Sequence, residues 1–322
     1  MTSSSVYISI YNIPLEFLFA REIAYFSRKF LLPLGACNGY YLLRHSWGII
    51  YMRNFIREKK IVCGKKYMEV DLYALNENQL DKKKSKRSKK KKVSLPKQDK
   101  LNDKNARRKF IWLAESNFGE GDIFLTLTYK DEYLPKSYDE ANKEMTNFFL
   151  RIRRRIKTLG LDDEFRYIVV TSEKKSKDES IRFHHHLLIK SSLGRDEIEN
   201  LWRRRRKKGE KIGDAIGYAN SKRIQEDVNT GILGLANYLA RHCTYRRRWS
   251  CSKNLERPYI RTNDYKYSRK RLIEYALDPY DVNRWEMIYK GYKITDKDNG
   301  IVATYNDFTG WSIYLKLRKR LC

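Results

Sequence analysis

Three consecutive histidines, His184, His185 and His186, lie in the strand-like run RFHHHLLIK of a chain that has only five histidines in 322 residues. Side chains of a β-strand alternate between its two faces, so we expect His184 and His186 on one face and His185 on the other. Two imidazoles on one face supply half of the ligands of a typical metal site. The alternative is a solvated strand end, or histidines that are bonded to backbone groups as partly buried polar side chains often are.

A carboxylate in the preceding run would complete this metal site. The runs FRYIVVTSE (165–173) and RFHHHLLIK (182–190) are joined by a short charged segment, which predicts an antiparallel hairpin. We expect Ile168 and Val170 to point at the covering helices, which leaves Glu173 on the open face with the two outer histidines. Three ligands with open coordination positions are what metal-assisted catalysis requires. The alternative is that Glu173 simply begins a solvated turn.

The segment GILGLANYLARHC (231–243) predicts a short amphipathic helix. Its polar face carries Gly234, Tyr238 and His242 at four-residue spacing, so these three residues lie on one side of the helix. The phenol of Tyr238 therefore projects beside a glycine, which leaves room for an approaching backbone. Because the chain has 24 tyrosines, a single one is more often a packing residue than a reacting one. His242 can equally be an ordinary surface residue.

The charge balance makes a polyanion the expected partner. The chain has 68 Lys and Arg against 39 Asp and Glu, a formal net charge of +29, and 41% hydrophobic residues are enough for a substantial core. We find no apolar run of about 20 residues, the length that crosses a membrane, and expect no membrane partner. The five cysteines are scattered without a CxxC pair, which favours a reducing cytoplasm over a disulfide framework.

Composition divides the chain into four segments. Residues 1–80 are an N-terminal region without recognisable chemistry, and residues 81–100 (DKKKSKRSKKKKVSLPKQDK) predict a lysine-rich flexible linker because like charges repel and apolar residues are nearly absent. This linker is either a nonspecific contact to DNA phosphates or a solubilising loop. Residues 101–258 alternate helical and strand-like patterns and form the predicted catalytic domain. Residues 259–322 form a predicted C-terminal α/β extension.

The strands FLTLTY and HHHLLI and the helix ANYLARHC stand in an order that resembles the HUH endonuclease superfamily. More narrowly, the chain from about Asn105 to about Pro258 resembles the replication-associated (rolling-circle initiator) proteins of single-stranded DNA bacteriophages, plasmids and prophages. The resemblance implies an α+β fold with a central antiparallel sheet, helices on one face of this HUH/RRM-like domain, and the metal site on the other face.

The resemblance also implies the roles of the site residues. It makes His184 and His186 the paired ligands of a divalent ion, Mg²⁺ or Mn²⁺, Glu173 the third ligand, and Tyr238 the nucleophile. Tyr238 would nick a single-stranded DNA origin and leave a 5′-phosphotyrosyl linkage with a free 3′-hydroxyl. Some relatives have a second tyrosine four residues later, where this chain has His242. We therefore expect one catalytic tyrosine, with His242 as a proton acceptor or metal neighbour.

Replication by such an initiator would need partners in the cytoplasm of a bacterial host. The sequence contains no GxxxxGK[ST] phosphate loop, so we expect a host helicase and a host polymerase to act with it.

Alternatives to this interpretation stay open. The middle position of the HUH motif is usually bulky and apolar, whereas this chain has His185 there, and a register slip of one residue would leave only His185 on the open side. An HUH relaxase or transposase would share the chemistry but serve transfer or transposition. A basic DNA-binding regulator would have the charge without the catalysis.

Two arginine clusters are the predicted DNA contacts, because basic groups bind phosphates and tryptophans can stack on unpaired bases. In the first cluster, LWRRRRKK (201–208), the spacing of Trp202 favours packing instead. The predicted contact residues are Arg203, Arg204, Arg205, Arg206, Arg241, Arg246, Arg247, Arg248 and Trp249.

Overall fold

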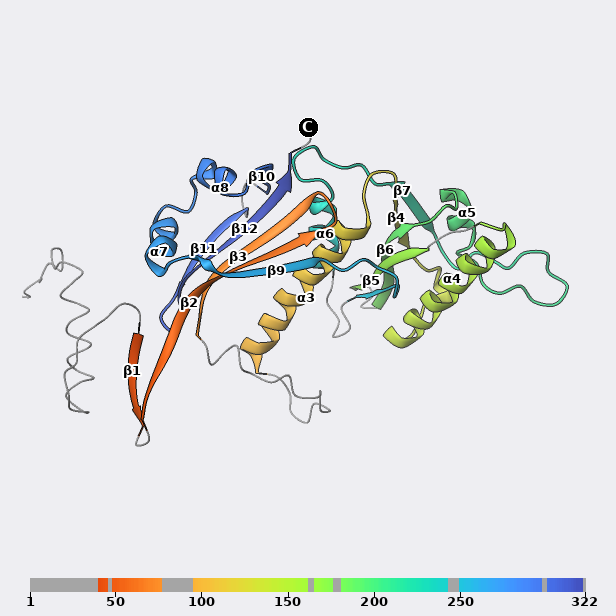
Figure 1. The fold of residues 1–322 in the computed structure, drawn as a ribbon. Helices are drawn as coiled ribbons and strands as arrows, with labels where there is room; N and C mark the ends of the chain where they lie inside the picture. The colour runs from red at the N-terminus through yellow and green to blue at the C-terminus, as the bar shows by residue number, and fades with distance from the viewer. Residues whose placement is uncertain are drawn as a thin grey trace, which may run out of the picture. The chain divides into compact units, whose positions relative to one another are not determined.

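The computed structural model of the chain describes residues 40–45, 48–76, 95–161, 165–175, 181–242, 249–296 and 300–320. These residues form two antiparallel sheets with helices packed on them, which confirms the predicted α+β class (Figure 1). None of the helices in this part of the chain is both long and apolar enough to cross a membrane.

The smaller sheet carries the histidine run. Its strands are β4 (Ile123–Leu127), β5 (Arg166–Lys175), β6 (Ile181–Lys190), β7 (Ala219–Arg223) and β8 (Ser250–Cys251). They lie in the order β7-β4-β6-β5-β8, and β5 and β6 form the predicted antiparallel hairpin.

One face of this sheet packs against α4 (Tyr138–Thr158) and α5 (Arg195–Asn200), with the short 3-10 helix η1 (Asp131–Tyr133) nearby in the chain. Helix α4 begins where the Ser137 side chain accepts a hydrogen bond from the Glu140 amide, an N-cap that satisfies one free backbone donor. The apolar stripe predicted for α4 is buried, as the amphipathic pattern requires. Its members are Ala141, Met145, Phe148, Phe149, Ile152 and Ile156.

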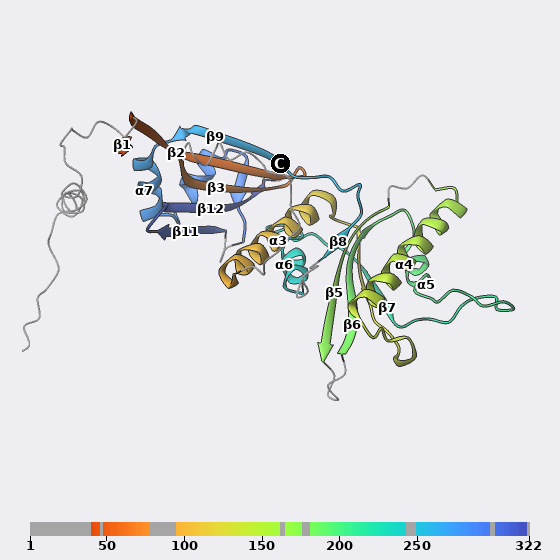
Figure 2. The same cartoon turned by 90° about the horizontal axis from the view of Figure 1, so that it is seen from below.

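The opposite face is also covered, by α3 (Pro96–Asn117) and α6 (Leu233–Arg241), which lie side by side (Figure 2). Ile168, Val170 and Leu188 pack against these two helices. The prediction that helices cover only one face is therefore wrong, because alternate residues on both sides of β5 and β6 are apolar and both sides must be shielded from water.

The larger sheet joins strands from both ends of the chain. It contains β1 (Tyr40–His45), β2 (Gly48–Cys63), β3 (Tyr67–Asn76), β9 (Tyr259–Tyr267), β10 (Tyr292–Ile294), β11 (Ile301–Asn306) and β12 (Gly310–Lys319). Their order is β1-β2-β3-β12-β10, with β9 beside β2 and β11 beside β12. Residues up to Asn54 and residues 76–82 form a separate compact unit, of which the β1–β2 hairpin is a described part.

Helices α7 (Arg269–Leu277) and α8 (Val282–Ile288) cover one face of the larger sheet through Leu272, Ala276 and Trp285. Composition places residues 1–80 and 259–322 in separate segments, whereas β2 and β3 share this sheet with β9 and β12. Most of the predicted linker at 81–100 lies outside the described residues, and its last five residues form the start of α3.

A buried ion pair links the larger sheet to the helices that cover the smaller one. Arg318 on β12 donates to both carboxylate oxygens of Glu115 on α3, at 2.9 and 2.8 Å, and to the carbonyl oxygen of Thr230, at 2.7 Å, just before α6. Gly231 has φ +61°, and a Cβ there would come within 2.1 Å of the Arg318 guanidinium, so only glycine fits this approach. Burial raises the pKa of Glu115 to about 7, and the charge of Arg318 acts against this rise.

We predict that Arg318→Ala lowers the free energy of unfolding by about 3–5 kcal/mol, because it leaves the Glu115 carboxyl buried without its partner. Arg320→Ala is the matched control, since Arg320 pairs with Glu286 two residues further along and its side chain is 58% exposed. We expect that change to cost less than about 1 kcal/mol. Urea unfolding followed by circular dichroism measures both, and equal losses would contradict a special role for Arg318.

Candidate metal centre and active site

The outer histidines of the triplet share one face of β6. His184 lies opposite Ser172 of β5, and His186 lies between Val170 of β5 and Thr126 of β4. The ring centroids of His184 and His186 are 5.0 Å apart, which confirms the alternation predicted from the sequence.

Helix α6 brings a third imidazole to this pair. His242 is the C-cap residue of α6, and its ring centroid lies 4.9 Å from that of His186. One ring nitrogen from each of His184, His186 and His242 lies within 4.8 Å of the others. The Ser172 hydroxyl donates to the His242 carbonyl oxygen at 3.0 Å, so the end of α6 is tied to the hairpin beside the histidines. Three imidazoles converging in this way are a common ligand set for a divalent ion.

The hydrogen bonding of His186 suits a metal ligand. Its Nδ1 lies 3.2 Å from the Thr126 hydroxyl, which fixes the ring. Its Nε2 is buried and has no hydrogen-bond partner among the described residues, although buried polar atoms are normally paired. Burial, and then the neighbouring His184 and His242, lower the pKa of His186 to about 4. The ring is therefore neutral near pH 7, with a lone pair that can bind a metal ion.

Glu173 does not lie with the histidines, so its predicted placement is wrong. The hairpin pairs Glu173 with Phe183, on the face of β6 that carries His185. The prediction assigned Ile168 and Val170 to the face of Leu187 and Ile189, but the register pairs Val170 with His186 instead. A residue in an antiparallel pair points to the same side as its partner, so Glu173 is on the opposite face from the metal ligands proposed here.

Tyr238 lies on the same side of α6 as His242, as the four-residue spacing predicts. Its ring centroid is 4.7 Å from that of His242 and 5.8 Å from that of His186, and 46% of the residue is exposed. A Cβ added at Gly234, one turn earlier, would meet nothing within 4 Å. The phenol therefore stands beside the three imidazoles with open space next to it.

His185 is a core residue. It is fully buried, with Nε2 at 2.7 Å from the Tyr129 hydroxyl and Nδ1 at 2.9 Å from the Thr171 hydroxyl. Burial lowers its pKa to about 3, so the ring is neutral and packs edge-on near Trp202. His185 thus fills the bulky middle position of the motif as a hydrogen-bonded neutral ring, and the register slip considered above does not occur.

The first arginine cluster is divided in its contacts. Arg204 is held by Glu210 and Asp214, whose carboxylates lie 2.7–2.8 Å from its guanidinium nitrogens, so its charge is largely neutralised within the loop. The Arg203 side chain donates to the Asn200 carbonyl oxygen at 3.0 Å. Arg205 and Arg206 are exposed. We expect the exposed pair to be the better phosphate contacts.

The remaining predicted contacts differ in position. Arg241 is exposed in the last turn of α6, three residues after Tyr238, and Arg246, Arg247 and Arg248 lie outside the described residues. Trp249 packs its ring edge-on against Phe110 and its indole nitrogen donates to the Ala106 carbonyl oxygen at 3.3 Å. Its contacts are those of a packing residue. Trp202 is buried and donates to the Thr128 carbonyl oxygen, the packing role that its spacing favours.

The neutral state of His185 predicts a pH dependence of stability. Its pKa is about 3 in the folded protein and near the ordinary 6.5 in the unfolded chain. The unfolded chain therefore binds the proton more tightly, so the stabilisation is complete above about pH 6.5 and is lost as the pH falls toward 3. We expect a loss of about 2–3 kcal/mol at about pH 4.5.

His185→Gln, which cannot titrate, is the control for that prediction. Urea unfolding near pH 7 and near pH 4.5 should give a smaller pH difference for the variant than for the wild type, by about 2 kcal/mol. The same difference in both proteins would show that another group causes the acid sensitivity.

Comparison with protein families gives one match to this region. A family model described as a replication-associated protein of the ORF2 type matches residues 122–227, which contain β4 to β7 and the histidine triplet but end before Tyr238 and His242. Searches of curated proteins and of solved structures found no match. The family match supports a replication-associated role for the protein.

Proposed function

We propose that the protein initiates rolling-circle replication by nicking and rejoining single-stranded DNA at an origin, as an HUH-type metal-dependent endonuclease and strand transferase. The observation that carries this proposal is the half-exposed Tyr238 beside three converging imidazoles, one of which has a buried nitrogen without a partner in the described part of the chain. The replication-associated family match agrees with it.

His184, His186 and His242 are the residues that would hold a divalent ion, with His242 in the place first expected for Glu173. Such an ion, when bound, would polarise the scissile phosphate and offset the charge that develops on its oxygens. Three nitrogen ligands favour Mn²⁺ over Mg²⁺ in binding strength, whereas cellular abundance favours Mg²⁺.

Tyr238 performs the covalent step in this proposal. Its hydroxyl oxygen attacks the phosphorus and releases its proton to solvent, since the residue is 46% exposed. The bond from phosphorus to the 3′ oxygen breaks, and this oxygen takes up a proton as the 3′-hydroxyl. The products are a 5′-phosphotyrosyl linkage and a primer end. The linkage keeps the phosphodiester energy for rejoining, when a 3′-hydroxyl attacks the same phosphorus and returns Tyr238.

The surroundings of Tyr238 suit a polymer substrate. Gly234 leaves one side of the phenol open, and Arg241 is exposed one turn further along the same helix. Arg205 and Arg206 add exposed positive charge. We expect a host helicase to separate the strands and a host polymerase to extend the 3′-hydroxyl in the bacterial cytoplasm. A relaxase or transposase would use the same residues for transfer or transposition.

The test is a cleavage assay with labelled single-stranded DNA from the replicon of this protein, with Mn²⁺ or with EDTA. We expect cleaved DNA and a covalent protein–DNA band from the wild type with Mn²⁺ alone. Tyr238→Phe should abolish the band, because phenylalanine has no nucleophile. His242→Ala should lower the rate at least about 100-fold if it removes a ligand, as changes even in groups supporting a metal site cost about 10- to 100-fold.

Glu173→Gln is the matched control, because it changes a polar residue of the same hairpin that faces away from the three imidazoles. It should cleave at the wild-type rate. An adduct formed by Tyr238→Phe would show that the nucleophile is misassigned. A wild type that binds the DNA but never cleaves it would favour the non-catalytic DNA-binding regulator.

A further inference from the structure

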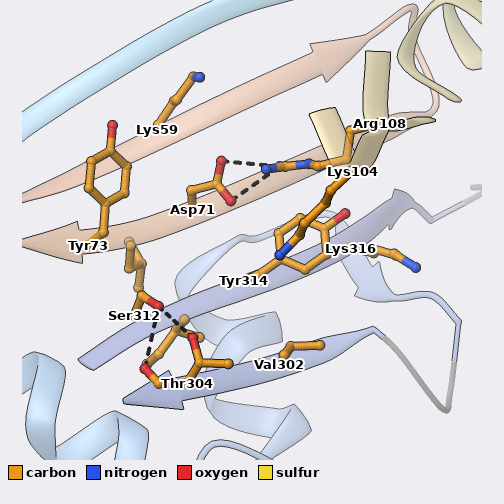
Figure 3. A pocket seen from close by; sticks show the side chains of 12 residues that line it. Lys59, Asp71, Tyr73, Lys104, Arg108, Val302, Thr304, Ser312, Tyr314 and Lys316 are labelled. Carbon is orange, nitrogen blue, oxygen red and sulfur yellow. Dashed lines mark hydrogen bonds and ion pairs between the residues drawn. The ribbon is translucent and has the colours of Figure 1, made fainter. Parts of the chain in front are cut away.

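The larger sheet has a polar face that lies away from the catalytic residues. Along β3 and β12, alternate residues such as Leu72 and Ile313 pack into the core with α7 and α8. Their neighbours Tyr73 and Tyr314 lie on the other side, where α3 borders a cavity of about 600 Å³ (Figure 3). A cavity of that size can take a nucleotide-sized ligand.

Two lysines of this cavity have their charge available. Lys59 rises from β2 and Lys104 projects from α3 (Figure 3), and neither makes an ion pair within the described ranges. The acidic group in the cavity, Asp71, is neutralised by Arg108, whose guanidinium lies 3.1 Å from a carboxylate oxygen. Lys316 is paired with Asp296. The two available charges on the cavity lining are therefore positive.

Aromatic rings stand among these charges. Tyr73 is half-buried on the strand next to Lys59. The Tyr314 ring lies under the Arg108 guanidinium, with 4.6 Å between the guanidinium carbon and the ring centroid. Aromatic side chains on a sheet face, flanked by basic groups, are how several folds hold single-stranded nucleic acid, because any base can stack on a ring while the cations bind phosphates.

We propose that this cavity, the sheet site (Lys59, Tyr73, Lys104 and Tyr314), binds single-stranded DNA outside the catalytic centre. Lys59 and Lys104 bind phosphates, and the Tyr73 ring stacks on a base. The choice of DNA as the ligand rests on the proposed function. The basic run KKKSKRSKKKK (82–92) falls outside the described residues and is no part of the site. It is kept unchanged in every variant below.

The first experiment measures binding of labelled oligothymidine to the full chain by fluorescence anisotropy, in EDTA and at several salt concentrations. Lys59→Gln/Lys104→Gln should weaken binding and reduce the slope of log K against log salt by about 1.4, or about 0.7 for each lost phosphate contact. Lys65→Gln/Lys290→Gln removes the same charge from exposed positions that do not line the cavity. It should leave the slope unchanged, and an equal effect of the two double variants would overturn the site.

The second experiment tests stacking. Tyr73→Ala should weaken binding about 5- to 100-fold, whereas Tyr73→Phe keeps the ring and should bind like the wild type. Wild-type affinity of Tyr73→Ala would overturn the stacking contact. Because EDTA removes the metal that cleavage is expected to need, these results do not depend on Tyr238. Absence of cleavage would overturn the proposed function alone, and an unchanged salt slope of the lysine variant would overturn the sheet site alone.

Discussion

The buried ion pair between Arg318 and Glu115 is the contact on which the arrangement of the site depends. Arg318 comes from β12, Glu115 from α3, and the same guanidinium binds the Thr230 carbonyl oxygen at the start of the turn into α6. The helix that presents Tyr238 and His242 is thus anchored to the last strand of the chain, which lies in the other sheet. A buried ion pair costs desolvation energy, and its value here is geometric, because few other groups could join three elements at one point.

The other end of α6 is fixed by the histidine strand itself. Ser172 holds the His242 carbonyl oxygen, Thr126 orients His186, and both belong to strands that flank β6. These contacts rest on regular strands and one helix, so the three imidazoles and the phenol are held by backbone that cannot move independently. Such pre-organisation is what a metal site and a nucleophile need if their groups are to meet one phosphate. The neutral His185 on the opposite face anchors the same strand in the core.

Local patterns in the sequence are enough to predict part of this. The period of two places His184 and His186 together, and the helical period places Tyr238 with His242 and defines the buried stripe of α4. The face of Glu173 is not predictable in the same way, because it depends on which residue of β6 each residue of β5 pairs with. Both faces of these strands carry aliphatic residues, so hydrophobicity alone does not decide the matter.

Long-range features leave no local signal. The pairing of β3 with β12 joins residues more than 200 positions apart, and nothing around Arg318 in the sequence indicates that it reaches Glu115 and Thr230. Helical spacing indicates His242 as a neighbour of the site, but its convergence with His184 and His186 requires the packing of α6 on the sheet. The sheet site likewise appears only when β2, β3, β12 and α3 are assembled.

The central claim is that His184, His186 and His242 together form one metal site. Crystals of the full chain soaked in Mn²⁺, with diffraction data collected at the manganese absorption edge, would locate the ion directly. The account predicts a single strong anomalous peak in contact with ring nitrogens of these three histidines, and its loss in His242→Ala. A peak bound to the Glu173 carboxylate, or no peak at the three imidazoles at saturating Mn²⁺, would contradict it.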